Sequence, residues 1–457
     1  MGKEYSRHHF YDPEEIRRYT DREIKACAQT YYIDPSNYDT HNVKRGLRDN
    51  DGNGVVTGLT KISMINAKKR VDGKLVPIDG QLYYRGYNIY DLIARVEDGA
   101  GFGYERVAYL LLYGELPNET ELDEFRRILN ESRSLPVNFV RDVIMKASTN
   151  DIMNSMMRSI LTLQAYDSNA RDISLENVLR QSLMLISVFP MLAVYGYHAY
   201  NHYENDESMY IHRPDDNISF AGNLLRLLRP DKSFTPGEEQ ALDAALILHM
   251  EHGGGNNSTF TTRTVTSSGA DTYSVIAAAM ASLSGPRHGG ANIKVRQMME
   301  DIEKNVHDHR DKDELNAYLL KLLNGEAFDR SGLIYGIGHA IYSVSDPRAG
   351  ALKTFTEQLA REKGRYDEFE FYTSVAEAAP QIISDKRKMY KGVSANVDFY
   401  SGFLYNMLGI PEELFTPMFA IARIVGWSAH RIEELAGRGK IIRPAYESLM
   451  LIRDLDR

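Results

Sequence analysis

The chain has 457 residues, of which 43% are hydrophobic and 26% charged, a composition typical of a soluble globular protein. Its net charge of -9 argues against general nucleic-acid binding, so an anionic ligand would need a local basic pocket. At this length two domains are the usual expectation.

Cys27 is the only cysteine, which excludes an internal disulfide framework and fits a reducing compartment. The first residues are charged and lack the apolar segment of a signal peptide. No uninterrupted apolar run approaches 18 residues, so we expect no membrane-spanning segment. These features together predict a cytoplasmic protein.

The first forty residues are polar, with a weak helical tendency and no clear core face. Residues 54–92 differ, because β-branched and aromatic residues flank an Asp-Gly pair at Asp72-Gly73. Asp-Gly between such runs is a strong signal for a β-hairpin turn. We therefore predict one or two short strands there.

The remaining pattern is helical almost to the end, with apolar residues three and four positions apart. A capping residue followed by proline predicts helix starts at Thr235, Asp346 and Thr416. An alanine-rich helix is expected from Asp271 to the Gly285-Pro286 break. No long linker appears, so a second domain would be an insertion. The predicted fold is mainly α.

Arg423 lies in the most apolar of these segments, with no carboxylate within one helical turn. A guanidinium stays charged, so when buried it needs a partner. That partner is either a distant acidic residue or the carboxylate of a ligand. The alternative is an arginine whose stem reaches the surface.

His249 and His252 share a helical stripe near the end of the helix that begins after Thr235. They are either satisfied core histidines or functional groups. A zinc site is the weaker interpretation, because His-x-x-His lacks the spacing of a zincin helix and no thiolate set is present.

Two further residues occupy unusual surroundings. His288 lies in the glycine-rich turn GPRHGGAN, where a substrate could approach the imidazole closely. Asp398 lies between Val397 and Phe399, so burial would raise its pKa and make it a better base. Taken alone, His288 is best interpreted as an ordinary turn histidine, and Asp398 as a helix-capping or turn aspartate.

Gly336 and Gly338 resemble half of a dinucleotide-binding fingerprint, but Ile341 stands where the third glycine belongs. No preceding strand supports that interpretation either. What remains is His339 in a glycine-rich turn, with Arg348 in the first turn of the following helix.

In this order, the segments GPRHGGAN, GHAIYSVSDPRA, NVDFYSG and FAIARIVGWSAH resemble the citrate synthase family. The earlier segments LYYRGYNIYDL and LILHMEH fit the same pattern, so the resemblance runs from about Gly54 to the C-terminus. It implies condensation of acetyl-CoA with oxaloacetate, hydrolysis of the thioester, entry into the tricarboxylic acid cycle, and no cofactor beyond the coenzyme A substrate.

The resemblance also implies roles for individual residues. Asp398 would remove a proton from the acetyl methyl group, and His288 would donate to the thioester oxygen. His339 would polarise the ketone of oxaloacetate. The carboxylates of oxaloacetate would be bound by His252, Arg348, Arg423 and, from the partner subunit of a homodimer, Arg443. The backbone of Gly336 and Gly338 would cradle the adenine of CoA, with Asn396 near the acyl end.

The chain departs from the family pattern in two places. A basic residue that usually meets a CoA phosphate is missing near Ser343 and Val344. The cluster Lys386-Arg387-Lys388-Lys391 either supplies that charge or is a solvated face. Arg287 stands where a leucine usually precedes the histidine, and nothing in the sequence explains it.

By resemblance the fold is all-helical, with a polar extension (1–50), a large domain (51–287 and 396–457) and a small domain (288–395) that closes over the substrates. Three alternatives remain open. A 2-methylcitrate synthase would take propionyl-CoA, a citrate-synthase-like binding protein would not catalyse, and a metal-dependent hydrolase would use His249 and His252.

Overall fold

The computed structural model describes residues 14–49, 52–99, 101–387 and 392–452. The chain divides into two compact units, Met1–Gly58 and Leu59–Arg457. The described part of the first unit contains α1 (Glu14–Tyr31), α2 (Ser36–Thr40) and a 3-10 turn (Arg45–Leu47). Most side chains of α1 are exposed, in keeping with the polar character of this segment.

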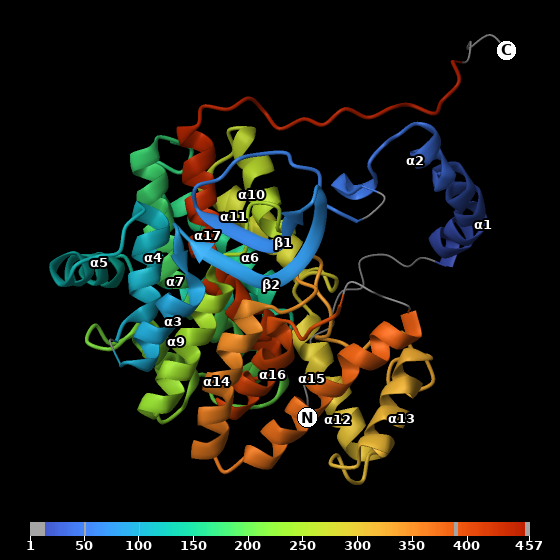
Figure 1. The fold of residues 1–457 in the computed structure, drawn as a ribbon. Helices are drawn as coiled ribbons and strands as arrows, with labels where there is room; N and C mark the ends of the chain where they lie inside the picture. Colours follow the sequence, from blue (N-terminus) through green and yellow to red (C-terminus); the bar gives the residue numbers. More distant parts are fainter. Residues whose placement is uncertain (1–13, 50–51, 100, 388–391, 453–457) are drawn as a thin grey trace. The chain divides into compact units, whose positions relative to one another are not determined.

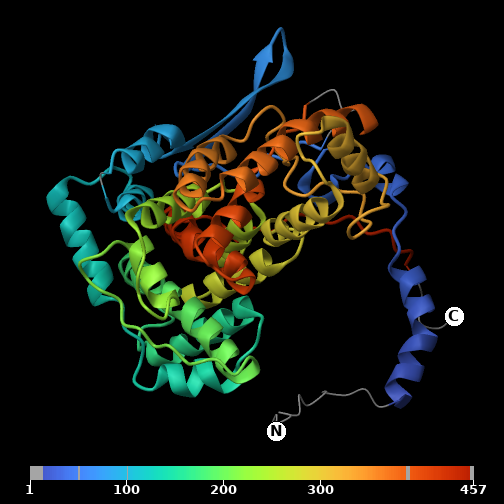
Figure 2. The same ribbon diagram turned by 90° about the horizontal axis from the view of Figure 1, so that it is seen from below.

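The predicted hairpin is present at the start of the second unit. Strand β1 (Ser63–Val71) pairs antiparallel with β2 (Lys74–Tyr84), and β2 pairs with the short β3 (Tyr87–Asn88). Asp72 and Gly73 form the turn with positive φ angles of 48° and 80°, the backbone that an Asp-Gly pair favours. The strands project from the helices (Figure 2).

The rest of the second unit is helical, which confirms the predicted fold class. The longer helices are α3 (Ile89–Glu97), α4 (Gly103–Tyr113), α5 (Glu119–Glu131), α6 (Ile152–Leu163), α7 (Leu175–Glu204), α8 (Phe220–Leu228), α9 (Pro236–Met250), α10 (Asn257–Ser267), α11 (Thr272–Ser284), α12 (Ala291–Asn305), α13 (Lys312–Leu323), α14 (Pro347–Glu362), α15 (Tyr366–Arg387), α16 (Val397–Met407) and α17 (Phe415–Ala436). Short 3-10 or π turns span Val140–Ile144, Met145–Ala147, Gln164–Tyr166 and Glu412–Leu414.

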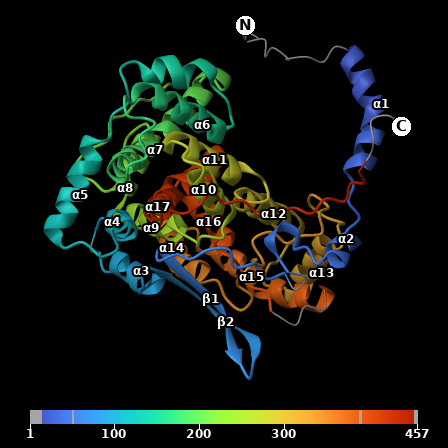
Figure 3. The same cartoon turned by 90° about the horizontal axis from the view of Figure 1, so that it is seen from above.

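Helix α17 is the axis of this unit. It packs against α4, α6, α7, α9, α10 and α11 (Figure 3), and its residues from Pro417 to Arg431 are all buried. Burial on every side explains why the sequence is apolar around its whole circumference. Arg423 therefore lies in a helix stretch that is shielded from solvent on every side.

Two predicted helix starts are confirmed and one is wrong. Thr235 forms a capping box with Glu238 at α9, and Asp346 caps α14. Helix α17 instead begins at Phe415, and Leu414 is its N-cap. The hydroxyl of Thr416 donates to the carbonyl of Gly289 at 2.9 Å. Thr416 thus ties α17 to the turn that contains His288.

Helix α7 is long and apolar enough, by length and composition, to cross a membrane, although the sequence has no unbroken apolar run of that length. Within its most apolar window, 83% of the residues are buried inside the protein. This burial is what a core helix requires, and α7 packs against α5, α6, α8 and α17.

Beyond α17, residues 437–452 continue as an extended segment without regular structure (Figure 1). The two-domain division within 51–457 stays a prediction, since Leu59–Arg457 forms one compact unit by its contacts. Helix α14, from the expected small domain, packs against both α9 and α16 of the expected large domain.

Candidate active site

The predicted site residues gather at the ends of helices. His252 follows the C-terminal end of α9, while His288, Arg348 and Asp398 lie at or just before the starts of α12, α14 and α16. His252 is not on the α9 stripe as predicted, because the helix ends at Met250 and Glu251 has extended backbone angles. Helix starts present free N–H groups and a partial positive charge, which favours anionic ligands.

His339 has a defined protonation state. The backbone N–H groups of Ile341 and Tyr342 both donate to its Nδ1, at 3.1 and 3.3 Å. Nδ1 therefore carries no proton, and the proton of the neutral ring is on Nε2. Burial, and then the charge of Arg348, lower the pKa of His339 to about 4. At neutral pH the ring is an uncharged donor through Nε2.

His252 lies against His339, with ring centroids 5.2 Å apart and the planes nearly perpendicular. It is buried, and no residue in the described part of the chain hydrogen-bonds its Nε2. Burial and the charges of Arg348, His339 and Arg423 hold its pKa well below the usual range. A buried imidazole nitrogen without a partner is costly unless a ligand satisfies it.

Arg348 is 3% exposed and forms a two-pronged ion pair with Asp346, at 3.0 Å from Nε and 2.7 Å from Nη2. Its Nη2 also lies 3.4 Å from Nε2 of His339. Burial lowers the pKa of Arg348, but Asp346 more than compensates and raises it overall. Asp346 thus holds the guanidinium beside the imidazole.

Arg423 is buried without an ion pair in the described residues. Its Nε donates to the carbonyl of His249 at 2.6 Å, while Nη1 has no hydrogen-bond partner among those residues. The ring of Phe419 lies 4.8 Å from the guanidinium carbon. Burial lowers the pKa of Arg423 to about 10, which leaves it charged at neutral pH. An unpaired buried cation needs an anion.

His288 is held through residues that the sequence analysis did not single out. Its Nε2 lies 3.4 Å from the backbone nitrogen of Ser258 and 3.1 Å from the Ser258 hydroxyl. The indole N–H of Trp427 donates to that hydroxyl at 3.2 Å. Because a backbone N–H can only donate, Nε2 accepts and the proton is on Nδ1.

Burial, and then Arg423, lower the pKa of His288 to about 4, so it too is a neutral donor at neutral pH. A sequence signal for Trp427 existed. It is the only tryptophan, it lies in the most apolar helix, and its buried N–H requires an acceptor. Ser258 had no such signal, because nothing in the sequence shows that this serine in the first turn of α10 is buried beside His288.

Asp398 occupies the first turn of α16, and Asn396 is the N-cap that accepts from its backbone nitrogen at 3.0 Å. Burial raises the pKa of the Asp398 carboxyl to about 6, although the charges of Arg348 and Arg423 oppose this. The raised pKa and the influence of both arginines mark a carboxylate that faces the same space as the two cations.

Gly336 and Gly338 have φ angles of 75° and 101° and form an antiparallel bridge with Ser394 and Asn396. Gly338 N donates to Ser394 O, and Asn396 N donates to Gly336 O. In this pattern the N–H and C=O groups of the intervening Ile337 point away from the bridge. The side chain of Asn396 also donates to Gly338 O at 2.8 Å.

The other predicted residues lie apart from this group. Arg443 is exposed in the extended C-terminal segment, and Arg287 is exposed beside His288 without any contact that explains it. Lys386 and Arg387 are exposed at the end of α15, while Lys388 and Lys391 lie outside the described residues.

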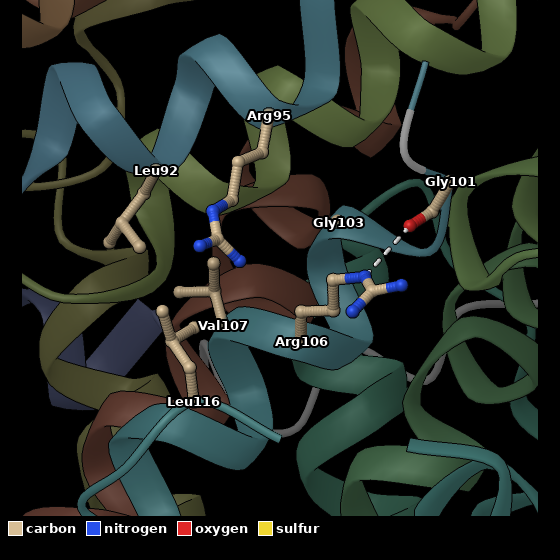
Figure 4. A pocket seen from close by; sticks show the side chains of 7 residues that line it. All are labelled: Leu92, Arg95, Gly101, Gly103, Arg106, Val107 and Leu116. Atoms are coloured by element: carbon tan, nitrogen blue, oxygen red, sulfur yellow. Dashed lines mark hydrogen bonds between the residues drawn. The ribbon is translucent and has the colours of Figure 1, made fainter. Parts of the chain in front are cut away.

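A metal site and a small pocket are the two other features that bear on function. Within residues 14–49, 52–99, 101–387 and 392–452, no group of three or more His, Cys, Asp or Glu side chains could hold a metal ion. A small pocket opens between α3 and α4 (Figure 4), and none of the predicted site residues line it. Its lining is Leu92, Arg95, Gly101, Gly103, Arg106, Val107 and Leu116.

A family model described as "Citrate synthase, C-terminal domain" matches residues 51–445. The chain belongs to the citrate synthase family. The resemblance inferred from its motifs is thereby confirmed, and with it the classification as an acyltransferase enzyme.

Similar proteins include a citrate synthase of Haloferax volcanii, 33% identical, with 88% of this chain and 94% of that protein aligned. A 2-methylcitrate synthase of Shewanella oneidensis is 32% identical, over 80% of this chain and 87% of that protein. A citrate synthase of Thermoplasma acidophilum, solved as a ternary complex with carboxymethyl coenzyme A and oxaloacetate, has a TM-score of 0.70 at 25% identity, covering 88% and 96% of the two chains.

Proposed function

We propose that this enzyme condenses acetyl-CoA with oxaloacetate and hydrolyses the resulting citryl-CoA to citrate and CoA. The observation that carries the proposal is a pair of buried nitrogen atoms, Arg423 Nη1 and His252 Nε2, that have no hydrogen-bond partner in the described residues. His252 and Arg348 both lie beside His339, whose Nε2 carries a proton. A small keto acid with two carboxylates fits this arrangement of cations around a ketone-directed donor.

In the proposed mechanism Asp398 removes a proton from the methyl group of the thioester. The Nδ1–H of His288 donates to the thioester oxygen, where negative charge develops as the enol forms. The nucleophilic carbon then attacks the ketone carbon of oxaloacetate, and the Nε2–H of His339 protonates the new alkoxide. Water finally cleaves the thioester and releases the thiol of CoA.

The adenine of CoA is assigned to the outward-facing backbone groups of Ile337, between Gly336 and Gly338. Gly392 lies beside Ser343, because a Cβ at Gly392 would be 2.8 Å from the Ser343 carbonyl oxygen. This neighbourhood supports a CoA-phosphate role for the basic cluster that begins at Lys386. A homodimer with shared sites and a cytoplasmic location remain part of the proposal.

The choice of thioester is tested by steady-state kinetics. With oxaloacetate as co-substrate, release of free thiol is expected to give a higher kcat/KM for acetyl-CoA than for propionyl-CoA. One methylene is worth about 1–3 kcal/mol in a pocket, or roughly 10- to 200-fold in rate. A preference for propionyl-CoA would make the chain a 2-methylcitrate synthase, and no thiol release from either would favour a binding protein.

The role of Arg423 is tested by Arg423→Leu, which is expected to weaken oxaloacetate binding by at least about 30-fold, because a buried charged hydrogen bond to a ligand is worth about 2–5 kcal/mol. Its cost in stability should be smaller than that of the control below, since the only hydrogen bond of Arg423 to the described residues is the one to the His249 carbonyl. Calorimetric titration and thermal unfolding measure the two effects.

Arg431→Leu is the matched control, on the same helix and equally buried. All three of its nitrogen donors are satisfied, by Thr272, Thr266 and the Ala270 carbonyl. This control should lose stability and keep its oxaloacetate affinity. If Arg423→Leu instead unfolds like Arg431→Leu and its folded fraction binds normally, Arg423 is structural.

A further inference from the structure

One face of α17 holds the peptide segment that leads into His252. Arg423 binds the carbonyl of His249, and His430, two turns later, contacts the carboxylate of Glu251 at 2.9 Å. Between them, a Cβ at Gly426 would lie 2.5 Å from both the Met250 carbonyl oxygen and Glu251 Oε2. The segment therefore lies directly on the helix, and glycine is needed for the contact.

Glu251 is fully buried and only half satisfied. Its Oε1 accepts from Ser63 Oγ at 2.9 Å and from the backbone nitrogen of Gly253 at 2.6 Å, in addition to His430. Its Oε2 has no hydrogen-bond partner in the described part of the chain. Burial raises the pKa of Glu251, but the hydrogen bond from His430 and the charge of Arg423 lower it overall, so the carboxylate is ionised.

His430 acts on Glu251 as a hydrogen-bond donor. The Nε–H of Arg263 points at His430 Nδ1 at 3.0 Å, and because that group can only donate, Nδ1 carries no proton. The neutral ring then donates through Nε2 to Glu251. His430 consequently adds no positive charge that would neutralise Glu251. The negative charge of Glu251 instead acts on Arg423, and it raises the pKa of Arg423 more than any other charge does.

We propose that Glu251 is the internal counter-charge of Arg423 in the empty site and limits the affinity for the dianionic substrate. The carboxylate stabilises the buried guanidinium before substrate arrives. Once a substrate carboxylate binds Arg423, the two anions repel each other, so Glu251 weakens binding. This role rests on the proposed function, because it takes the Arg423 ligand to be a carboxylate of oxaloacetate.

The test is Glu251→Gln, which keeps an oxygen to accept at the Oε1 position and removes the charge. The expected result is about tenfold tighter oxaloacetate binding by calorimetry, the size of effect that a partly screened buried charge produces. The free variant should also melt at a lower temperature than the wild type. Glu433→Gln is the control, since Glu433 lies on the same helix as Arg423 but pairs with Arg263, and its affinity should stay within about twofold of wild type.

A double-mutant cycle gives a readout that needs no ligand. Arg423→Leu combined with Glu251→Gln removes both charges. The Tm of this double variant should therefore be higher than the Tm of Glu251→Gln alone, and this comparison holds even if Glu251→Gln folds poorly. Equal or weaker binding by folded Glu251→Gln, or additive changes in Tm, would overturn the proposal. If the wild-type chain does not bind oxaloacetate, the proposed function is wrong. The changes in Tm across the double-mutant cycle would still show whether Glu251 and Arg423 form a charge pair.

Discussion

Asp398→Asn should lower kcat by about 10²–10⁴-fold, the usual contribution of a general base, and leave oxaloacetate affinity close to that of the wild type. Asparagine keeps the shape of the side chain but cannot accept the proton of the thioester methyl group. The cations proposed to bind the substrate, Arg348 and Arg423, are untouched. Thiol release measures kcat, and calorimetric titration measures the affinity.

The pH dependence follows from the raised pKa of Asp398, which burial moves from 3.8 to about 6. The base is ionised above that pH, so kcat/KM should rise through pH 6 and then level off. The fold favours the neutral carboxyl, and its stabilisation is full below pH 3.8 and lost as the pH rises through 6. Asp398→Asn is therefore expected to be at least as stable as the wild type at pH 8.

Asp243→Asn is the matched control for this experiment. Burial, and then the charge of Glu105, raise the pKa of Asp243 to about 8, but its carboxylate accepts from the backbone of Gly103 and Tyr104. Its folded fraction should keep normal turnover, because no substrate group is expected there. Turnover near the wild-type value in Asp398→Asn would show that another group is the base.

Mixing an Arg443→Ala chain with an Asp398→Asn chain should restore activity that neither parent has. Arg443 lies in the exposed segment after α17, and by family resemblance it completes the oxaloacetate pocket of a partner subunit. Each heterodimer would then contain one intact site and one site with both defects. Random exchange should yield about one quarter of wild-type activity, because half of the dimers would be mixed and half of their sites intact.

The control for this exchange is Lys440→Ala, which removes a cation from the same exposed segment and should remain active as a homodimer. Light scattering and differently tagged chains establish that heterodimers have formed. Heterodimers without activity would mean that Arg443 serves its own chain or has no role in the site.

Local chemistry was enough to predict several elements from the sequence. The Asp72-Gly73 turn and the capping box at Thr235 depend on interactions within a few residues, so the local sequence is enough to predict them. The helix start predicted at Thr416 was wrong because the Thr416 hydroxyl donates to the carbonyl of Gly289, which is remote in sequence. His252 was misplaced for a similar reason: Glu251 leaves the helix to meet Ser63 and His430.

Some features of the candidate site could likewise be predicted from the sequence, and others could not. The residue pattern was sufficient to single out a cation in an apolar segment at Arg423, the glycine-flanked His288 and His339, and an aspartate in apolar surroundings at Asp398. Their order along the chain was sufficient for the family resemblance. None of this required knowledge of which side chains touch.

The hydrogen-bond partners and the proton positions, by contrast, follow from the packed structure. Arg348 is paired with Asp346, two residues away, whereas Arg423 has no ion pair in the described residues and donates to the His249 carbonyl, remote in sequence. The proton positions on His288 and His339 depend on backbone N–H groups, and a sequence does not show where those groups point. Burial, which sets the pKa of Asp398, is likewise a property of the packed chain, because desolvation depends on every neighbour at once.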